Sequence, residues 1–330
     1  RDPEMSRGLG DVYKRQMNCK EIAELFKRKP YYLRMGNVNI ARRLNTLPEE
    51  VIKARKIYRA SSEQSPRYPR ILILDIETAP LRAFVFNMWN QNITIDKIIS
   101  DWYCLCWSAK WLFEENIYSD RLSPEEARSE NDCRILLNLK GLLDEADIVV
   151  SHNGDKFDLP RINTRFLLNN IPTPTPYQSV DTYKVVRNQF SFASNKLDFL
   201  ATKFGFPNKI ETTFELWSRC VDGEEDALIA MERYNKYDVE LLENVYLRLR
   251  PYIKNHPNVA LYMEATERVC PNCGSKHVSL EGSYYTNTNK YELYRCECGT
   301  LSRARLAVTP KKIKENLLTV SYTHLTLPTN

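Results

Sequence analysis

A short apolar run that ends in two acidic residues is the clearest pattern in the chain. Residues Ile71 to Leu74 are apolar and Asp75-Ile76-Glu77 follows them, which predicts a buried strand over 71–78. Side chains alternate along a strand, so Asp75 and Glu77 are expected on one side of it. Neighbouring carboxylates repel each other unless a cation neutralises them, so the pair indicates a divalent metal site or a raised pKa. A solvated strand exit without a metal is the alternative interpretation.

Further periodic segments extend from this strand to residue 250. Aromatic and apolar runs predict strands, and apolar residues at helical spacing predict helices. The segments 82–89 and 102–111 are expected to be antiparallel neighbours. Their order along the chain predicts an α/β fold, with a mixed sheet flanked by helices. The expected strands are 82–89, 102–111, 147–151 and 177–186, and the expected helices are 124–143, 195–204 and 225–249.

Three short helices are expected before the α/β segment, over 19–28, 38–44 and 48–58. The last two resemble a helix-turn-helix module over 17–60, followed by a proline-containing linker over 61–70. In that interpretation the last helix exposes a basic face for DNA, formed by Lys53, Arg55, Lys56 and Arg59. A three-helix cap or a protein-docking module explains the same pattern.

Two later segments carry residues that can act with the acidic strand. His152-Asn153-Gly154 lies in a polar turn after a strand, and Asp158 opens the next helix near the edge where the first strand ends. Tyr234 and Asp238 are four residues apart on the last helix, so they share a face. A tyrosine hydroxyl beside a carboxylate is well placed to orient a water molecule. A helix N-cap at Asp158 and an amphipathic helix edge at Tyr234 are the simpler interpretations.

The order of these motifs is more specific than any one of them. An acid-x-acid strand, then Asn-Gly-x-x-Phe-Asp, then Tyr-x-x-x-Asp resembles the three motifs of the DEDD (DnaQ-like) 3′–5′ exonuclease superfamily, in its tyrosine-containing branch. The resemblance covers about residues 71–250. In detail this segment resembles the proofreading exonuclease domains of family B DNA polymerases and the YprB-type ribonuclease-H-like domains of phages and bacteria. It implies a ribonuclease-H-like fold.

The resemblance also implies an activity and its residues. It implies hydrolysis of phosphodiester bonds with two bound Mg²⁺ or Mn²⁺ ions, and hard oxygen ligands without a clustered histidine favour these metals over zinc. His152 and Asn153 are expected to contact the terminal nucleotide, although His152 equally suits a structural turn. Asp181 is a further candidate that supports the site. The implied catalytic residues are Asp75, Glu77, Asp158, Tyr234 and Asp238, of which the four carboxylates bind the metals.

Three functions therefore stay open. The leading one is a metal-dependent 3′–5′ exonuclease acting on single-stranded DNA, with DNA favoured over RNA. The second is a structure-selective endonuclease on the same fold, and the third is an inactive DNA-binding regulator. A binding-only protein does not need four convergent carboxylates, which argues against the third. Replication or repair proteins are possible partners of all three.

Four cysteines near the end of the chain have the spacing of a zinc site. Cys270, Cys273, Cys296 and Cys298 form two turns separated by strand-like segments, which predicts a zinc ribbon over 268–319 with one structural Zn²⁺. The second turn is Cys-x-Cys, so His277 is an alternative ligand. A basic surface beside it suits phosphate contacts, although ribbons also dock proteins. It comprises Arg295, Arg303, Arg305 and Lys311 to Lys314.

Charge is unevenly distributed along the 330 residues. Residues 17–70 hold 13 basic and 5 acidic residues, residues 71–267 hold 21 and 30, and residues 268–319 hold 9 and 4. Basic ends around an acidic middle suit a polyanionic substrate handled by a metal-loaded site. Nine cysteines without a secretion signal favour a reducing compartment, and no apolar stretch is long enough to span a membrane. We therefore expect a cytoplasmic protein that does not bind membranes, and the resemblance to domains of phages and bacteria implies a bacterial or phage-infected cell.

Both ends of the sequence differ from the rest. Residues 1–16 and 320–330 resemble translated sequencing-adapter read-through, and we exclude them from fold reasoning. Residues 251–267 are expected to be a linker between the α/β segment and the ribbon.

Overall fold

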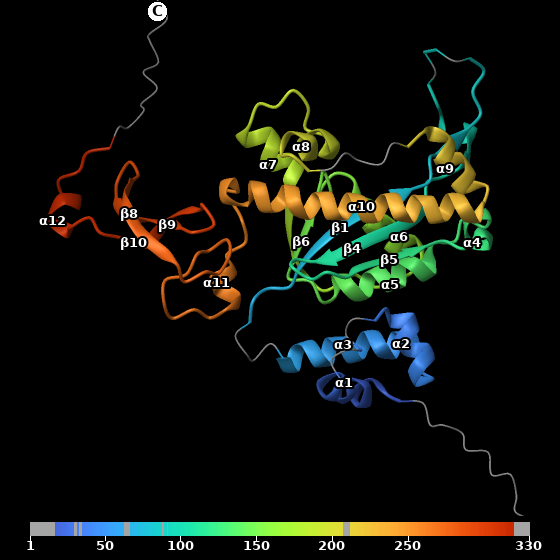
Figure 1. The fold of residues 1–330 in the computed structure, drawn as a ribbon, viewed down its shortest axis with the longest axis horizontal. Helices are drawn as coiled ribbons and strands as arrows, with labels where there is room; N and C mark the ends of the chain where they lie inside the picture. Colours follow the sequence, from blue (N-terminus) through green and yellow to red (C-terminus); the bar gives the residue numbers. More distant parts are fainter. Residues whose placement is uncertain are drawn as a thin grey trace, which may run out of the picture. The chain divides into compact units, whose positions relative to one another are not determined.

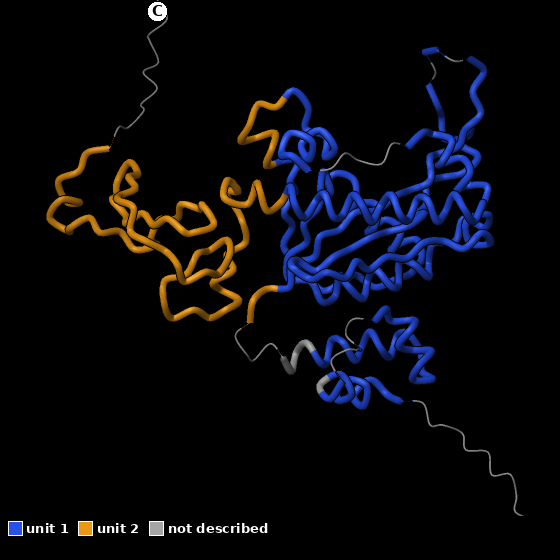
Figure 2. The backbone as a smooth tube through the Cα atoms, viewed as in Figure 1, with its two compact units in different colours: residues 1–65, 70–184, 193–245 blue, residues 66–69, 185–192, 246–330 orange. Residues whose placement is uncertain are grey.

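The computed structural model describes residues 17–29, 32, 35–62, 67–87, 89–90, 92–206 and 212–319. The segments interpreted as adapter-derived, 1–16 and 320–330, lie outside these residues. The chain divides into two compact units (Figure 2). Unit 1 comprises 1–65, 70–184 and 193–245, and unit 2 comprises 66–69, 185–192 and 246–330.

A five-stranded mixed sheet forms the centre of unit 1, which confirms the predicted α/β fold. The strand order is β5-β4-β1-β6-β7. The central strand β1 is antiparallel to β4 and parallel to β6, β4 is antiparallel to β5, and β6 is parallel to β7. The bounds are β1 Ile71–Thr78, β4 Cys104–Trp111, β5 Ile117–Arg121, β6 Ile148–Ser151 and β7 Gln178–Asp181.

Helices cover both faces of this sheet (Figure 1). On one face Trp107 of β4 donates its indole N–H to the carbonyl of Ile135 at 2.7 Å, which anchors α5 (Cys133–Leu143). On the other face Ser119 of β5 donates to Glu232 at 2.6 Å, which anchors α10 (Glu225–Leu249). The remaining helices of the α/β part are α4 Pro124–Arg128, α6 Asp158–Leu168, α7 Thr182–Gln189, which begins in unit 1 and continues into unit 2, α8 Leu197–Lys203 and α9 Phe214–Val221.

The segment 82–89 is not a long strand of the main sheet, so that prediction is wrong. Only β2 (Arg82–Ala83) forms there, and it pairs with β3 (Ile98–Ser100) instead of β4. The neighbouring turn η2 spans Ile95–Lys97. The aromatic side chains that suggested a buried strand are exposed, because no layer of unit 1 covers them; they are Phe84, Phe86 and Trp89.

Two other elements end earlier than predicted. The helix expected over 124–143 is split into α4 and α5, because Glu130 has a left-handed backbone and the buried Asp132 accepts hydrogen bonds from Arg165. The strand expected over 177–186 ends at Asp181, whose carboxylate accepts backbone N–H groups and thereby starts α7. Strand β5 was not predicted.

The N-terminal segment folds as three helices with a core of its own. They are α1 Cys19–Arg28, α2 Asn37–Leu44 and α3 Pro48–Ser62. These helices also contact α5: Asn37 donates to the carbonyl of Leu137, and a Cβ at Gly141 would overlap the Asn37 amide. Glycine at position 141 therefore permits the close approach of α2 and α5.

Arg55 does not belong to an exposed basic face, contrary to the sequence prediction. It is 3% exposed and forms an ion pair with Glu145, which also pairs with Arg70 at 3.2 Å. The Arg55 side chain donates to Asn37 at 2.7 Å as well. A buried guanidinium needs such partners, so α3 directs this charge at the α/β part of unit 1.

Unit 2 contains a three-stranded antiparallel sheet of order β10-β9-β8. Arg250 donates to Tyr68 at 2.7 Å within this unit, and Asn272 donates back to the Arg250 carbonyl at 3.0 Å. No helix among the described residues is long and apolar enough to cross a membrane. The bounds are η3 Arg250–Tyr252, α11 Val259–Tyr262, β8 Val278–Tyr285, β9 Lys290–Cys296, β10 Leu301–Ala307 and α12 Lys311–Lys314.

Removing Glu145 tests the buried ion pair. Glu145→Ala would leave the Arg55 guanidinium buried without its carboxylate, so we expect the free energy of unfolding to fall by about 3–5 kcal/mol, measured by urea denaturation. The matched control is Lys53→Ala, which removes an exposed ion pair on the same helix and should change stability little. Equal stability of the Glu145→Ala and control proteins would contradict a structural role for this pair.

Candidate metal and active site

Three carboxylates from two distant segments converge in unit 1. Oxygens of Asp75, Glu77 and Asp238 all lie within 4.8 Å of one another. Asp75 and Glu77 share the face of β1 opposite the Trp107 side, because Asp75 pairs with Ser108 and Ile76 pairs with Trp107. That face is covered by α10, which supplies Asp238.

Asn235 fixes the orientation of one of these carboxylates. Its side-chain N–H donates to Asp75 Oδ2 at 2.6 Å, and the residue is fully buried. The sequence analysis did not identify Asn235, although it lies three residues before Asp238 on the same helix. Because this buried amide holds one oxygen of the Asp75 carboxylate, it restricts the direction in which the other oxygen of the same carboxylate points.

Asp158 stands beside the three carboxylates but is not one of that group. Strands β1 and β6 pair only from Ile71 to Ile73, so the Ile76 N–H is left for Asp158, which accepts it at 3.2 Å. The side chain is 2% exposed. Burial, together with the nearby Asp181 carboxylate, raises the pKa of Asp158 to about 7.

Asp181 organises the turn that precedes Asp158. One of its oxygens accepts the backbone N–H groups of Asn153 at 2.9 Å and Tyr183 at 3.0 Å. Asn153 has a left-handed backbone with φ of 67°, which asparagine tolerates better than most residues. Asp181 therefore supports the turn through backbone contacts, which agrees with the supporting place suggested for it.

Both ring nitrogens of His152 have protein partners. Nδ1 lies 2.9 Å from the Thr182 hydroxyl, and Nε2 lies 2.8 Å from the Asn195 carbonyl oxygen. The ring also packs edge-on against Tyr183, with centroids 5.6 Å apart. These contacts favour the structural-turn interpretation of His152.

A cavity of about 1380 Å³ connects these residues. All the predicted catalytic residues, together with His152 and Asn153, line it. Tyr234 is 7% exposed, and its ring lies 6.0 Å from that of Trp217. The other wall comes from segments without a recognisable motif, which the sequence analysis missed; it includes Tyr183, Lys196, Phe199, Lys203 and Trp217.

The acidic residues suit a divalent cation of the Mg²⁺ or Mn²⁺ type. Carboxylate oxygens are the hard ligands that these ions prefer, and no histidine belongs to the acidic group among the described residues. Three carboxylates within 4.8 Å repel one another strongly unless positive charge is placed between them. The same charge would favour the ionised form of Asp158 beside them.

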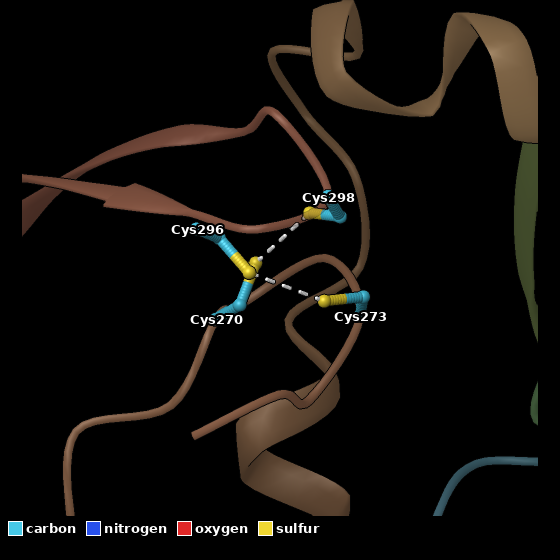
Figure 3. Close-up of side chains that lie close together, drawn as sticks. All are labelled: Cys270, Cys273, Cys296 and Cys298. Atoms are coloured by element: carbon cyan, nitrogen blue, oxygen red, sulfur yellow. Dashed lines mark hydrogen bonds between the residues drawn. The ribbon is translucent and has the colours of Figure 1, made fainter. Parts of the chain in front are cut away.

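The four predicted cysteines also converge, in unit 2 (Figure 3). The Cys270 and Cys298 sulfurs are 3.7 Å apart, and those of Cys273 and Cys296 are 3.5 Å apart. His277 is exposed and is not a member of this group, so the four cysteine sulfurs could hold a metal ion without it. Gly274, which follows the first pair, has φ of 74°, a conformation that tightens this turn.

The comparisons with known proteins agree with this fold. Residues 113–250 match the RNase_H superfamily. The matched segment includes Asp158, Tyr234 and Asp238 but begins after Asp75 and Glu77. No curated protein matches this sequence. A ribonuclease-H-like α/β domain with an acidic group at its sheet supports a nuclease that uses divalent metals.

One solved structure is similar to part of this chain. The chain resembles the family B DNA polymerase from the hyperthermophilic archaeon Pyrobaculum calidifontis, at 15% identity and a TM-score of 0.42. The similarity covers 69% of this chain and 32% of the polymerase, so the chain spans about a third of that protein's length.

The raised pKa of Asp158 predicts a pH-dependent stability without divalent metal. Between about pH 4 and pH 7 the folded protein keeps a proton that the unfolded chain has lost, so stability falls as pH rises through this window. Asp158→Asn removes this titration. Relative to that variant, the native protein should lose on the order of 2 kcal/mol between pH 5 and pH 7, measured by urea denaturation in Mg²⁺-free buffer. Parallel pH curves for the two proteins would contradict the burial argument.

The cysteine cluster predicts one zinc ion per chain. Cys273→Ser should reduce bound zinc well below one equivalent, measured by atomic absorption after gel filtration, because serine is a poor zinc ligand. Cys133→Ser, a half-buried cysteine outside the cluster, is the matched control and should keep its zinc. Full zinc occupancy in Cys273→Ser would assign the metal to another site.

Proposed function

We propose that this protein is a two-metal-dependent 3′–5′ exonuclease that hydrolyses phosphodiester bonds of single-stranded DNA. The observation that carries the proposal is the convergence of Asp75, Glu77 and Asp238 within 4.8 Å in a cavity that Asp158 and Tyr234 also line. Four carboxylates and a tyrosine from three separate segments have a simple common purpose in metal-assisted phosphodiester hydrolysis.

Each residue has a defined part in this proposal. Asp75, Glu77, Asp158 and Asp238 would hold the two cations, whose positive charge would favour deprotonation of water and stabilise negative charge on the leaving 3′ oxygen. Asn235 keeps the Asp75 carboxylate in place through its 2.6 Å hydrogen bond. Tyr234 lies four residues before Asp238 on the same helical face and orients the attacking water with its hydroxyl.

The opposite wall of the cavity suits a nucleotide strand. Lys196 and Lys203 bring positive charge to an otherwise acidic cavity, where they can neutralise phosphates next to the bond that is cleaved. Phe199 and Trp217 offer apolar faces for bases. Stacking needs unpaired bases, which favours a single strand over a duplex.

The preference for an exonuclease rests on the motif order, which resembles the tyrosine branch of the DEDD superfamily. The endonuclease alternative drew on duplex recognition by the helix-turn-helix-like module at 17–60 and by the ribbon at 268–319. Arg55 of that module is occupied by Glu145, so its basic face is smaller than the sequence suggested. We retain the domain division at 17–60, 61–70, 71–250, 251–267 and 268–319, a cytoplasmic location, and replication or repair partners as parts of this proposal.

Cleavage of matched linear and circular strands tests it. With Mg²⁺ or Mn²⁺, a 5′-labelled single-stranded oligonucleotide should give a ladder that shortens from the 3′ end, and the same strand circularised should stay intact. Asp75→Ala should reduce the rate roughly 10³-fold or more, because a metal ligand is lost. Glu240→Ala, an exposed acid two residues after Asp238, is the matched control and should keep full activity.

The outcomes separate the alternatives. A cut circle would replace the exonuclease with an endonuclease on the same site. Full activity in the Asp75→Ala protein would remove the proposed site altogether. Binding without cleavage of either strand in every metal would favour the regulator.

A further inference from the structure

Two tyrosines lie side by side on one face of the three-stranded sheet in unit 2. Tyr284 of β8 stands opposite Tyr291 of β9 in the antiparallel register, so both side chains lie on the same face. The next pair on this face is Gly282 opposite Leu293. A Cβ built on Gly282 would meet no heavy atom within 4 Å, so the surface beside the two tyrosines is open.

An arginine from the third strand joins the two tyrosines. Arg303 of β10 is opposite Leu293, and its guanidinium lies 4.3 Å from the Tyr291 ring centre and 5.9 Å from that of Tyr284. Within the part of the chain that the structure describes, Arg303 forms no ion pair. Its charge is therefore available to an anion at the edge of the rings.

The other face of the same sheet is different. Tyr285 and Lys290 oppose each other there, with the ammonium 5.6 Å from the ring centre. Nearby, Arg268 lies over Tyr294, but Glu292 pairs with Arg268 at 2.8 Å and also accepts from the Tyr294 hydroxyl. This second face already supplies its own carboxylate to its arginine.

We propose that the face formed by Tyr284, Tyr291 and Arg303 binds a single strand of nucleic acid, with bases stacked on the tyrosines and a phosphate at the guanidinium. Aromatic rings beside an unpaired cation are the combination that holds unpaired bases without sequence preference. Residues 268–319 carry 9 basic and 4 acidic residues. This excess of positive charge favours a nucleic acid over a protein surface of low net charge as the partner. None of the carboxylates of the proposed nuclease site belongs to unit 2, so this proposal does not depend on catalysis.

Binding measured in a cleavage-deficient background tests the proposal. The full-length Asp75→Ala protein is titrated into a fluorescein-labelled 20-nucleotide single strand without Mg²⁺ and followed by anisotropy at several salt concentrations. Tyr284→Leu and Tyr291→Leu should each weaken binding about tenfold at constant salt, because leucine keeps the apolar area but cannot stack. Arg303→Gln should weaken binding and reduce the salt slope by about 0.7, the value for one phosphate contact on a single strand.

The same sheet supplies matched controls. Tyr285→Leu and Lys290→Gln change a neighbouring tyrosine and cation on the opposite face and should alter the affinity less than about twofold. Thermal melting and zinc content of each variant identify any that fail to fold, and the remaining tyrosine variant then carries the test.

Three results would overturn the proposal. Equal affinity in the face variants and the controls would exclude nucleic acid from this face and leave it for a protein partner. An effect of Arg303→Gln alone, equal for single strands and duplexes, would reduce the face to a phosphate contact without stacking. Equal losses of affinity in variants of both faces would show that the single strand does not bind specifically to the face with Tyr284, Tyr291 and Arg303. Each result leaves the cleavage assay of linear and circular strands unaffected.

Discussion

Mutual repulsion among carboxylates is the constraint on which unit 1 depends. Asp75, Glu77 and Asp238 place oxygens within 4.8 Å of one another, and Asp158 is buried beside them. Such a group lowers the stability of a fold unless protons or cations compensate for it. Burial raises the pKa of Asp158, so this fourth carboxyl group can keep its proton and add no further negative charge to the group. A divalent cation is the other form of compensation, and it keeps all the carboxylates ionised.

The sheet supplies the geometry that holds the group together. Strand β1 is antiparallel to β4 from Leu72 to Thr78 but is parallel to β6 over only three residues, Ile71 to Ile73. The backbone N–H of Ile76, which β6 does not reach, is therefore available to Asp158. A longer β6 would have used this N–H in the sheet and excluded Asp158. Asp158, at the start of α6, therefore binds to β1 at the point where β1 and β6 stop pairing.

The sequence allowed prediction of features that depend on local periodicity. Alternation along a strand placed Asp75 and Glu77 on one face, and the spacing of four placed Tyr234 and Asp238 together on a helix whose observed bounds are those predicted. The α/β fold followed from the order of such elements. The four cysteines were also identified from the sequence, because each pair is separated by only one or two residues.

Features that depend on distant contacts were not predictable in the same way. Phe84 and Phe86 have the composition of a buried strand but are exposed, since burial depends on whether another layer covers them. Arg55 looked like a surface cation because its partner, Glu145, is ninety residues away in the sequence. Asn235 could not be identified from the sequence, because its partner Asp75 lies 160 residues away and no local pattern indicates their hydrogen bond.

The two proposed sites differ in the source of the positive charge that would attract a polyanion. The carboxylates of unit 1 can approach a phosphate only with bound cations between the two, and short-range coordination at oxygen atoms makes that attraction depend on the metal. Unit 2 presents Arg303 over Tyr291, where the charge is covalently part of the chain and the rings add contact area. Attraction to a guanidinium is screened by salt, whereas stacking is much less so. In the proposed function the acidic middle and the basic end are complementary, because a metal-dependent site would select the bond to be cleaved while the sheet face of unit 2 would hold the strand without reading its sequence.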